Sequence, residues 1–126
     1  MRVLYVDDDR INTLLFEEAC RLAPGLEVEV AGSGAEALSL VGQWQPQVLV
    51  IDLHLPDTTG LELLPRLRQA FGLPDAPAFL CSADDPAQAR QPALDAGFCG
   101  YWPKPVDLPA MLADLSRLAP GSVVRP

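Results

Sequence analysis

The stretch VLVIDLHLP, Val48–Pro56, places four apolar residues, three of them β-branched, directly before Asp52. An uninterrupted apolar run of this length is typical of a strand that is buried on both faces of a parallel sheet. The strand therefore has a carboxylate at its end. Because ligands of open α/β sheets bind beyond the carboxyl ends of the strands, we predict that Asp52 lies at a functional site.

Four other short apolar runs are bounded by turn residues, and each predicts a strand. The five predicted strands span residues 2–6, 26–31, 47–52, 77–82 and 99–102. Helical segments separate them, and strands joined in this way form a parallel sheet with helices on both faces. We therefore predict an α/β fold, a doubly wound five-stranded parallel sheet of the flavodoxin-like (βα)5 type with strand order 2-1-3-4-5. The alternating residues of the second strand suit an edge, and the apolar third strand suits the centre.

Apolar residues that share one face identify the helices. The residues predicted to face the core are Ile11, Leu15, Ala19 and Leu22 in the first helix, Ala37, Leu38 and Val41 in the second, Leu63, Leu64, Leu67 and Phe71 in the third, and Leu108, Met111, Leu112, Leu115 and Leu118 in the last. Ser33–Glu36 resembles a capping box, and Asp107 is placed to cap the last helix. Pro65 and Pro92 fall inside helices, so we expect the fourth helix, within 84–97, to be short, kinked or displaced.

The composition excludes several classes of protein. A chain of 126 residues has the size of one domain, which we expect at 1–119, with a tail or linker stub at 120–126. The formal net charge of -8 argues against direct nucleic-acid binding, since phosphate backbones are held by clustered Lys and Arg. No apolar run is long enough to span a membrane and no signal peptide is present, so we expect a cytoplasmic protein without direct membrane contact.

The three cysteines, Cys20, Cys81 and Cys99, are predicted to be buried free thiols in a reducing cytoplasm. Their number is odd, their surroundings are apolar and no CxxC spacing occurs, which favours neither disulfides nor a redox motif. A single histidine and scattered cysteines also argue against a structural zinc site.

Carboxylates follow two neighbouring strands of the predicted sheet. Asp7, Asp8 and Asp9 follow the first strand and Asp52 ends the third. Carboxylates that converge on one edge repel each other, so at least one pKa rises unless protons are shared or a metal binds. Oxygen ligands and open positions for water and phosphate suit Mg²⁺. The triplet alone would be interpreted as an acidic loop that caps a helix, and its pairing with Asp52 favours the metal site.

Two further strand ends supply other groups. Lys104 follows the fifth strand, where its ammonium can counter negative charge, and Lys104-Pro105 is a candidate cis peptide. Ser82 ends the fourth strand with a hydroxyl; alone it would be interpreted as a turn residue. A carboxylate can attack phosphorus and form an aspartyl phosphate. That chemistry needs a metal, a fixed cation and a donor for the phosphoryl oxygens, and the four strand ends contain all of these.

The ordered motifs are similar to a known family. From Val3 to about Leu118 the sequence resembles the receiver domains of two-component response regulators. The resemblance is carried by Asp7-Asp8, by DLHLPDTTG at 52–60, by Ser82-Ala83, by DAGFCGYWPKP at 95–105 and by the amphipathic last helix. It implies that Asp52 takes a phosphoryl group from the phosphohistidine of a histidine kinase or a histidine phosphotransfer domain.

The resemblance also implies roles for the residues around Asp52. Asp8 would bind Mg²⁺ directly, Asp7 would bind it largely through water, and the backbone carbonyl of His54 would complete the protein's ligands. Asp52 itself would also contact the ion.

The remaining implied roles concern the phosphoryl group and the response to it. Ser82 and Lys104 would contact phosphoryl oxygens, and Tyr101 would be the switch aromatic. His54 and Asp84 occupy the variable positions that tune hydrolysis of the aspartyl phosphate. Trp102, Pro103 and Pro92 are unusual and bear on how the output surface moves.

Three other functions fit the sequence less well. A pseudo-receiver that binds partners without phosphorylation is the main alternative, and the intact set of acidic, hydroxyl and lysine residues argues against it. A phosphohydrolase would need a general acid–base, which so short a chain has no cap domain to supply. A flavin site would need a phosphate-binding loop after the first strand, where three aspartates would repel phosphate. The opening VLYVDDDRINTLLFEEACRLAPG resembles receivers attached to hybrid histidine kinases. The sequence does not name the downstream protein target.

Overall fold

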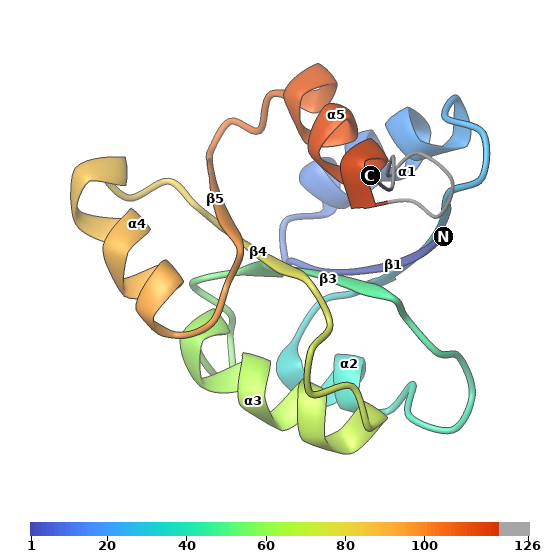
Figure 1. The fold of residues 1–126 in the computed structure, drawn as a ribbon, viewed down its shortest axis with the longest axis horizontal. Coiled ribbons are helices and arrows are strands. Elements are labelled where there is room, and N and C mark those ends of the chain that lie inside the picture. The colour runs from blue at the N-terminus through green and yellow to red at the C-terminus, as the bar shows by residue number, and fades with distance from the viewer. Residues whose placement is uncertain (119–126) are drawn as a thin grey trace, which may run out of the picture.

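Five parallel strands form one sheet in the order β2-β1-β3-β4-β5, which confirms the predicted topology (Figure 1). The computed structural model describes residues 1–118. The strands are β1 (Arg2–Val6), β2 (Glu27–Ala31), β3 (Val48–Asp52), β4 (Ala78–Ser82) and β5 (Gly100–Pro103). The helices are α1 (Arg10–Arg21), α2 (Gly34–Leu38), α3 (Gly60–Phe71), α4 (Pro86–Asp95) and α5 (Leu108–Leu118). The tail predicted at 120–126 lies outside the described residues.

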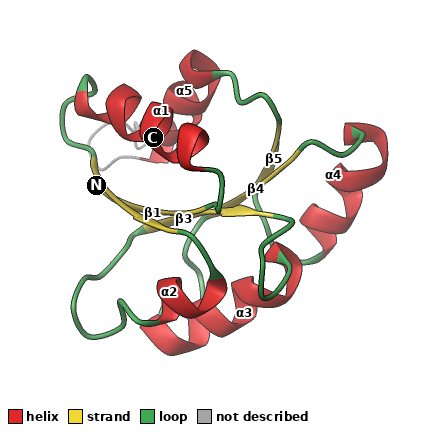
Figure 2. Cartoon of the chain, turned by 180° about the vertical axis from the view of Figure 1, so that it is seen from behind, coloured by secondary structure: helices red, strands yellow, loops and turns green. Residues whose placement is uncertain are grey.

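Helices cover both faces of the sheet, with α1 and α5 on one face and α2 and α3 on the other (Figure 2). Each face has its own apolar cluster. One contains Phe16 of α1 and Met111 of α5, and the other contains residues of α2, α3 and α4. All five residues of β3 are buried, whereas β2 exposes Glu27 and Glu29. The predictions of a central β3 and an edge β2 are therefore confirmed.

Short polar side chains begin the helices. Ser33 Oγ accepts a hydrogen bond from the Glu36 amide, and Asp107 Oδ1 accepts one from the Ala110 amide, so Ser33 and Asp107 are confirmed as the residues that cap these helices. The apolar faces predicted for α3 and α5 also pack against the core. The peptide bond between Lys104 and Pro105 is cis, as predicted.

The face predicted for α1 was wrong. Ile11 is 69% exposed and Leu22 is 84% exposed, and Leu15 is exposed as well. The buried residues are Thr13, Phe16 and Cys20, whose spacing is also helical. Phe16 packs edge-on against Tyr5 of β1, with ring centroids 4.5 Å apart. The larger apolar surface of an aromatic ring therefore sets the orientation of this helix.

Two predictions about the middle helices also need correction. Val41 was expected to face inward, but α2 ends at Leu38 and Val41 lies exposed in the following turns. Neither Pro65 nor Pro92 interrupts its helix, and α4 continues for ten residues, so the expectation that α4 would be short is wrong. Both prolines lie on exposed faces, where water can bond to the carbonyl group that each proline leaves without an amide donor.

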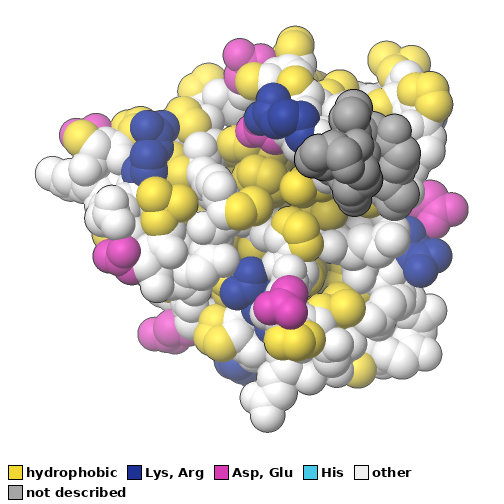
Figure 3. Space-filling view, in the orientation of Figure 1, with side chains coloured by type: hydrophobic (Ala, Val, Ile, Leu, Met, Phe, Trp, Pro, Cys, Tyr) yellow, Lys and Arg dark blue, Asp and Glu magenta, His cyan; other side chains and the backbone are white. Residues whose placement is uncertain are grey.

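Cys20 and Cys81 are buried free thiols, as predicted, but Cys99 is exposed. Cys99 directly precedes β5, which is an edge strand and is covered less completely than the central strands. Its side chain lies in a hollow of about 320 Å³ that Trp102 and Arg117 also line. Figure 3 shows hydrophobic side chains between α4 and α5 on this face, with charged side chains only in separate groups. Among residues 1–118, no helix has the length and apolar character needed to cross a membrane.

Candidate functional site at the carboxyl edge of the sheet

Alternation along the strands decides which side chains meet at the carboxyl edge. The strand residues that pack against α1 and α5 near this edge are Tyr5, Val50 and Trp102. Asp7, Asp52 and Lys104 each lie two positions further along the chain, and they meet on this same side of the sheet. Ser82 and Tyr101 have the opposite parity, and Tyr101 packs in the cluster with α3 and α4. The edge is thus divided into two halves.

The half beside α1 and α5 is a buried charge cluster. Lys104 Nζ lies 3.1 Å from Asp7 Oδ2 and 3.2 Å from Asp52 Oδ2, so one ammonium group bridges two carboxylates. Asp7 is 1% exposed and Asp52 is 5% exposed. One cation does not neutralise two buried carboxylates, and the cluster keeps an excess of negative charge.

This excess shows in the pKa values. Burial first, and then the charge of Asp7, raises the pKa of Asp52 to about 6, although Lys104 and a backbone hydrogen bond from His54 oppose the shift. Burial lowers the pKa of Lys104, but hydrogen bonds and charges from Asp7 and Asp52 outweigh it and leave the pKa raised. Lys104 is therefore a fixed cation at neutral pH. The ionised form of Asp52 is disfavoured by burial and by the charge of Asp7.

The acidic residues fit a hard divalent cation. Asp7, Asp8 and Asp52 each offer one carboxylate oxygen, and these oxygens lie within 4.8 Å of one another. Asp8 is exposed, so its carboxylate is open to solvent. Asp9 does not join the cluster, because its side chain accepts from the amides of Ile11 and Asn12 and caps α1. Oxygen donors with excess negative charge are the ligands that Mg²⁺ prefers.

Apart from an exposed pair between His54 and Asp84, the other half of the edge is held by uncharged hydrogen bonds. Ser82 is fully buried, and its Oγ accepts a hydrogen bond of 2.9 Å from the Asp84 amide. The Tyr101 hydroxyl donates to the carbonyls of Ser82 and Asp84, at 3.1 Å each. His54 Nε2 lies 2.9 Å from Asp84 Oδ2, and this exposed pair joins the loop after β3 to the loop after β4. All eight side chains singled out from the sequence thus lie at one edge.

Sequence reasoning missed three residues around this edge. The Tyr5 hydroxyl donates to Asp7 Oδ2 at 2.9 Å, and Asn12 Nδ2 lies 3.4 Å from the same oxygen. Tyr5 could have been found, because a residue two positions before Asp7 on a strand faces the same side. Asp57 accepts from two successive amides at the start of α2, both at 2.9 Å, and these bonds lower the pKa of Asp57. Its contacts lie 22 and 23 residues away in the chain, and no local pattern predicts them.

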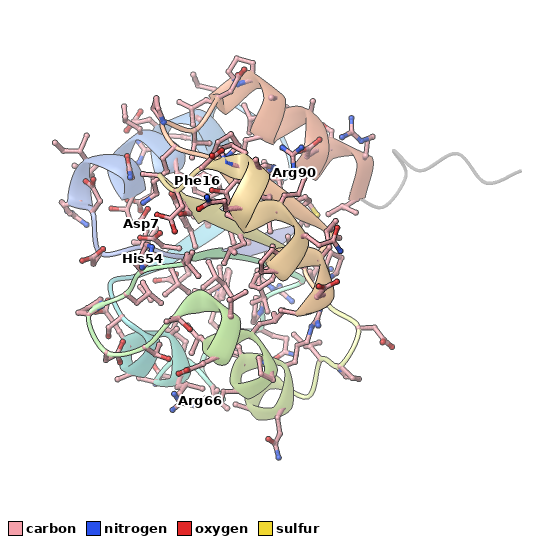
Figure 4. All side chains as sticks on the ribbon, turned by 90° about the vertical axis from the view of Figure 1, so that its left-hand side faces the viewer. Asp7, Phe16, His54, Arg66 and Arg90 are labelled. Carbon is pink, nitrogen blue, oxygen red and sulfur yellow. The ribbon has the colours of Figure 1, made fainter. Side chains whose placement is uncertain are left out.

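In the side-chain view, Asp7 and His54 both lie at one side of the molecule, below Phe16 of α1 (Figure 4). Arg66 projects from α3 at the far end of this view, away from the carboxyl edge. Among the described residues, Lys104 is the cation that contacts the cluster, since it forms ion pairs with both Asp7 and Asp52.

Comparison with known proteins identifies the family. A family model described as the response regulator receiver domain matches residues 3–116. The chain belongs to this family. The response regulator MprA of Mycobacterium leprae is 38% identical over 118 residues, which cover 94% of this chain and 50% of that protein. The receiver thus spans about half the length of the curated relatives it matches.

Solved receiver structures agree in fold. A putative response regulator from Chloroflexus aurantiacus has a TM-score of 0.83 at 30% identity, covering 93% of this chain and 95% of that chain. The chemotaxis response regulator CheY4 of Vibrio cholerae has a TM-score of 0.82 at 27% identity, covering 94% and 98%. A response regulator from Burkholderia pseudomallei, solved with a phosphorylated aspartic acid, calcium ion and citrate, has a TM-score of 0.76 at 26% identity, covering 89% and 64%.

Proposed function

We propose that this receiver domain accepts a phosphoryl group on Asp52. A carboxylate oxygen of Asp52 attacks phosphorus, the bond from phosphorus to the donor nitrogen or oxygen breaks, and an aspartyl phosphate forms. The observation that carries the proposal is the bridge from Lys104 to Asp7 and Asp52, because it fixes a cation beside the attacking carboxylate. The phosphorylated aspartic acid of the Burkholderia pseudomallei relative supports the same chemistry.

The acidic residues would hold Mg²⁺, which when bound supplies positive charge to the transferring phosphoryl oxygens. Asp8 and Asp52, with the His54 backbone carbonyl, are the proposed direct ligands. Asp7 is proposed to act through water, since both of its oxygens already accept hydrogen bonds, Oδ1 from the Asp9 amide and Oδ2 from Tyr5. Asp8 is exposed, and within residues 1–118 its carboxylate oxygens accept no hydrogen bond that would compete with the ion.

Ser82 and Lys104 are proposed to bond to the phosphoryl oxygens and so to report the modification. Ser82 Oγ now accepts from the Asp84 amide, and its own hydroxyl proton is available to a new acceptor. A hydroxyl drawn toward the phosphoryl group would pull on the backbone to which Tyr101 is bonded. Tyr101 is therefore proposed as the switch residue that changes the protein-binding surface around β4 and β5.

His54 and Asp84 are proposed to modulate hydrolysis of the aspartyl phosphate. Their side chains meet at 2.9 Å and connect the two loops that flank Asp52. Water that attacks the phosphoryl group from this side has to pass this pair. The pair would thereby affect the lifetime of the modification.

The proposed donor is a phosphohistidine of a histidine kinase or a histidine phosphotransfer domain. A protein donor has to rest beside Asp52, and α1 offers an apolar contact surface there. Ile11, Leu14 and Leu15 are exposed large apolar residues at helical spacing. Leu15 also lines a groove of about 70 Å³ with Pro105 and residues of α5. We propose that the donor binds across this groove and that an unidentified downstream protein reads the switched surface.

We further propose that the receiver occupies residues 1–119, with 120–126 as a tail or linker, and that it works in the cytoplasm. Because the matched relatives are about twice as long, we favour a receiver within a larger protein, and a hybrid histidine kinase is the context we propose. This context rests on the resemblance of the segment that opens the chain.

Intact mass measurement tests the proposal. The protein is incubated with acetyl phosphate or phosphoramidate, with and without Mg²⁺, beside the variant Asp52→Asn. We expect one phosphoryl adduct that requires Mg²⁺ and is absent from Asp52→Asn. A protein that binds Mg²⁺ and forms no adduct would instead support the phosphorylation-independent pseudo-receiver, which nothing in the described residues favours.

A further inference from the structure

Tyr5 is a buried polar residue next to the charge cluster, and the proposed reaction does not use it. It is 2% exposed and lies near the end of strand β1, two residues before Asp7, so the two side chains point to the same side of the sheet. Its ring packs against Phe16 of α1, and its hydroxyl donates to Asp7 Oδ2 at 2.9 Å. Burial above all, with Asp7 among the smaller contributions, raises the pKa of Tyr5, so the phenol is a protonated donor at neutral pH.

Packing alone does not require this hydroxyl. A phenylalanine would fill the same apolar site and keep the edge-on contact with Phe16. A buried phenol also has to find an acceptor, and it carries a desolvation cost if that acceptor is lost. The hydroxyl is therefore explained by what it does to Asp7.

Asp7 Oδ2 has three donor groups around it, Lys104 Nζ, the Tyr5 hydroxyl and, at the longer distance of 3.4 Å, Asn12 Nδ2. Lys104 Nζ approaches it at 3.1 Å and the Tyr5 hydroxyl at 2.9 Å, while the Asp9 amide holds the other oxygen at 2.9 Å. These directions fix the rotation of the carboxylate about its last bond. Residues that orient a metal-binding carboxylate through a hydrogen bond act on the metal site without touching the ion.

We infer that Tyr5 is a positioning residue of the acidic site, which holds the Asp7 carboxylate in the orientation that serves both Lys104 and a divalent cation. The inference deepens the proposed function and rests on it. Tyr5 also lines the groove between α1 and the loop before α5, so it connects the apolar floor of that groove to the acidic site.

The test is Mg²⁺ binding to the whole chain, measured by calorimetry on the wild type and on Tyr5→Phe. We expect the variant to bind Mg²⁺ about tenfold more weakly, the lower end of what loss of an orienting partner costs. Without Mg²⁺ the variant should stay folded, because the ring packing is kept, with a thermal midpoint lower only by the few degrees that the loss of one hydrogen bond to a buried carboxylate costs. Equal Mg²⁺ affinity in the two proteins would overturn the inference.

A spectroscopic signature gives a second measurement that does not depend on folding of Tyr5→Phe. The chain has two tyrosines, so in Tyr101→Phe the tyrosine band of the Raman spectrum, which is resolved from the bands of the two tryptophans, comes from Tyr5 alone. Addition of Mg²⁺ to Tyr101→Phe should perturb this band, because the ion changes the charge on the acceptor of the Tyr5 hydrogen bond. An unchanged tyrosine band at saturating Mg²⁺ would contradict the inference.

The outcomes separate this inference from the proposed function. A wild-type protein that neither binds Mg²⁺ nor forms the adduct would overturn both. A wild-type protein that does both, with Tyr5→Phe equal to it in Mg²⁺ affinity, would overturn the role of Tyr5 alone.

Discussion

The two halves of the carboxyl edge differ in how their side chains are held. Asp7, Asp52 and Lys104 form a buried cluster of full charges beside α1 and α5. Ser82 and Tyr101, on the opposite side of the strands, are held by uncharged hydrogen bonds to a loop. Buried charges are costly to rearrange, whereas single uncharged bonds are worth about 1 kcal/mol each. The charged half is therefore suited to hold reacting groups in place, and the uncharged half is suited to a conformational change.

The largest effect is expected when the charged half loses its cation. Lys104→Met leaves Asp7 and Asp52 facing each other without a counter-charge and removes the cation proposed to contact the phosphoryl group. The rate of adduct formation from acetyl phosphate at saturating Mg²⁺ should fall about 100-fold.

Arg117→Met is the matched control for Lys104→Met. It removes one positive charge from an exposed pair with Asp114 on α5, away from the cluster, and should leave the rate unchanged. A comparable loss of rate in both variants would mean that net charge, and not the Lys104 bridge, limits the reaction.

The next effect concerns stability. Asp52→Asn removes a buried carboxylate whose ionised form is disfavoured, so without Mg²⁺ it should raise the free energy of unfolding at about pH 7.5 by about 1–3 kcal/mol. Urea unfolding measures the difference. Saturating Mg²⁺ should reverse it, since the wild type alone keeps the full set of carboxylates.

The sign of the pH dependence follows from the raised pKa of Asp52, about 6 against an ordinary value of 3.8. The folded state holds this proton more tightly than the unfolded state. The destabilisation by ionised Asp52 is therefore fully present above the folded pKa and disappears as the pH falls toward the ordinary value. The stability gap between wild type and Asp52→Asn should narrow over this range, and a gap independent of pH would contradict the account.

A smaller effect is expected in the uncharged half. Tyr101→Phe removes two hydrogen bonds, but the Ser82 carbonyl still accepts from the Lys104 amide at 2.8 Å and Asp84 is open to water. The loss of stability should be about 0.5–1.5 kcal/mol. Faster amide exchange in the loop after β4, with exchange in β3 unchanged, would confirm that the loss is local; faster exchange throughout the sheet would contradict it.

The smallest effect is expected at the exposed pair that joins the two loops. His54→Ala should change the free energy of unfolding by about 0.5 kcal/mol or less, because exposed pairs contribute little. Arg21→Ala is the matched control, because it breaks a pair with Glu18 whose side chains are similarly exposed. A loss at His54 several times larger than at Arg21 would show that the loop connection is structural.

The strands and the residues at their ends were predictable from the sequence. Contacts between segments that lie far apart in the chain were not. The apolar run before Asp52 fixed the central strand, and the rule that strand ends share one edge brought Asp52, Lys104 and Ser82 together. The orientation of α1 was not predictable, because it depends on which of two helical stripes finds the better contact on β1. The role of Asp57 was not predictable for a similar reason, because its two hydrogen bonds depend on where α2 begins.

Mapping the modified residue tests the central claim most directly. After reaction with acetyl phosphate and Mg²⁺, borohydride reduces an aspartyl phosphate to homoserine, and peptide mass spectrometry locates it. The account predicts homoserine at position 52 alone. Homoserine at Asp8 or Asp7, or none while an intact adduct is present, would contradict it.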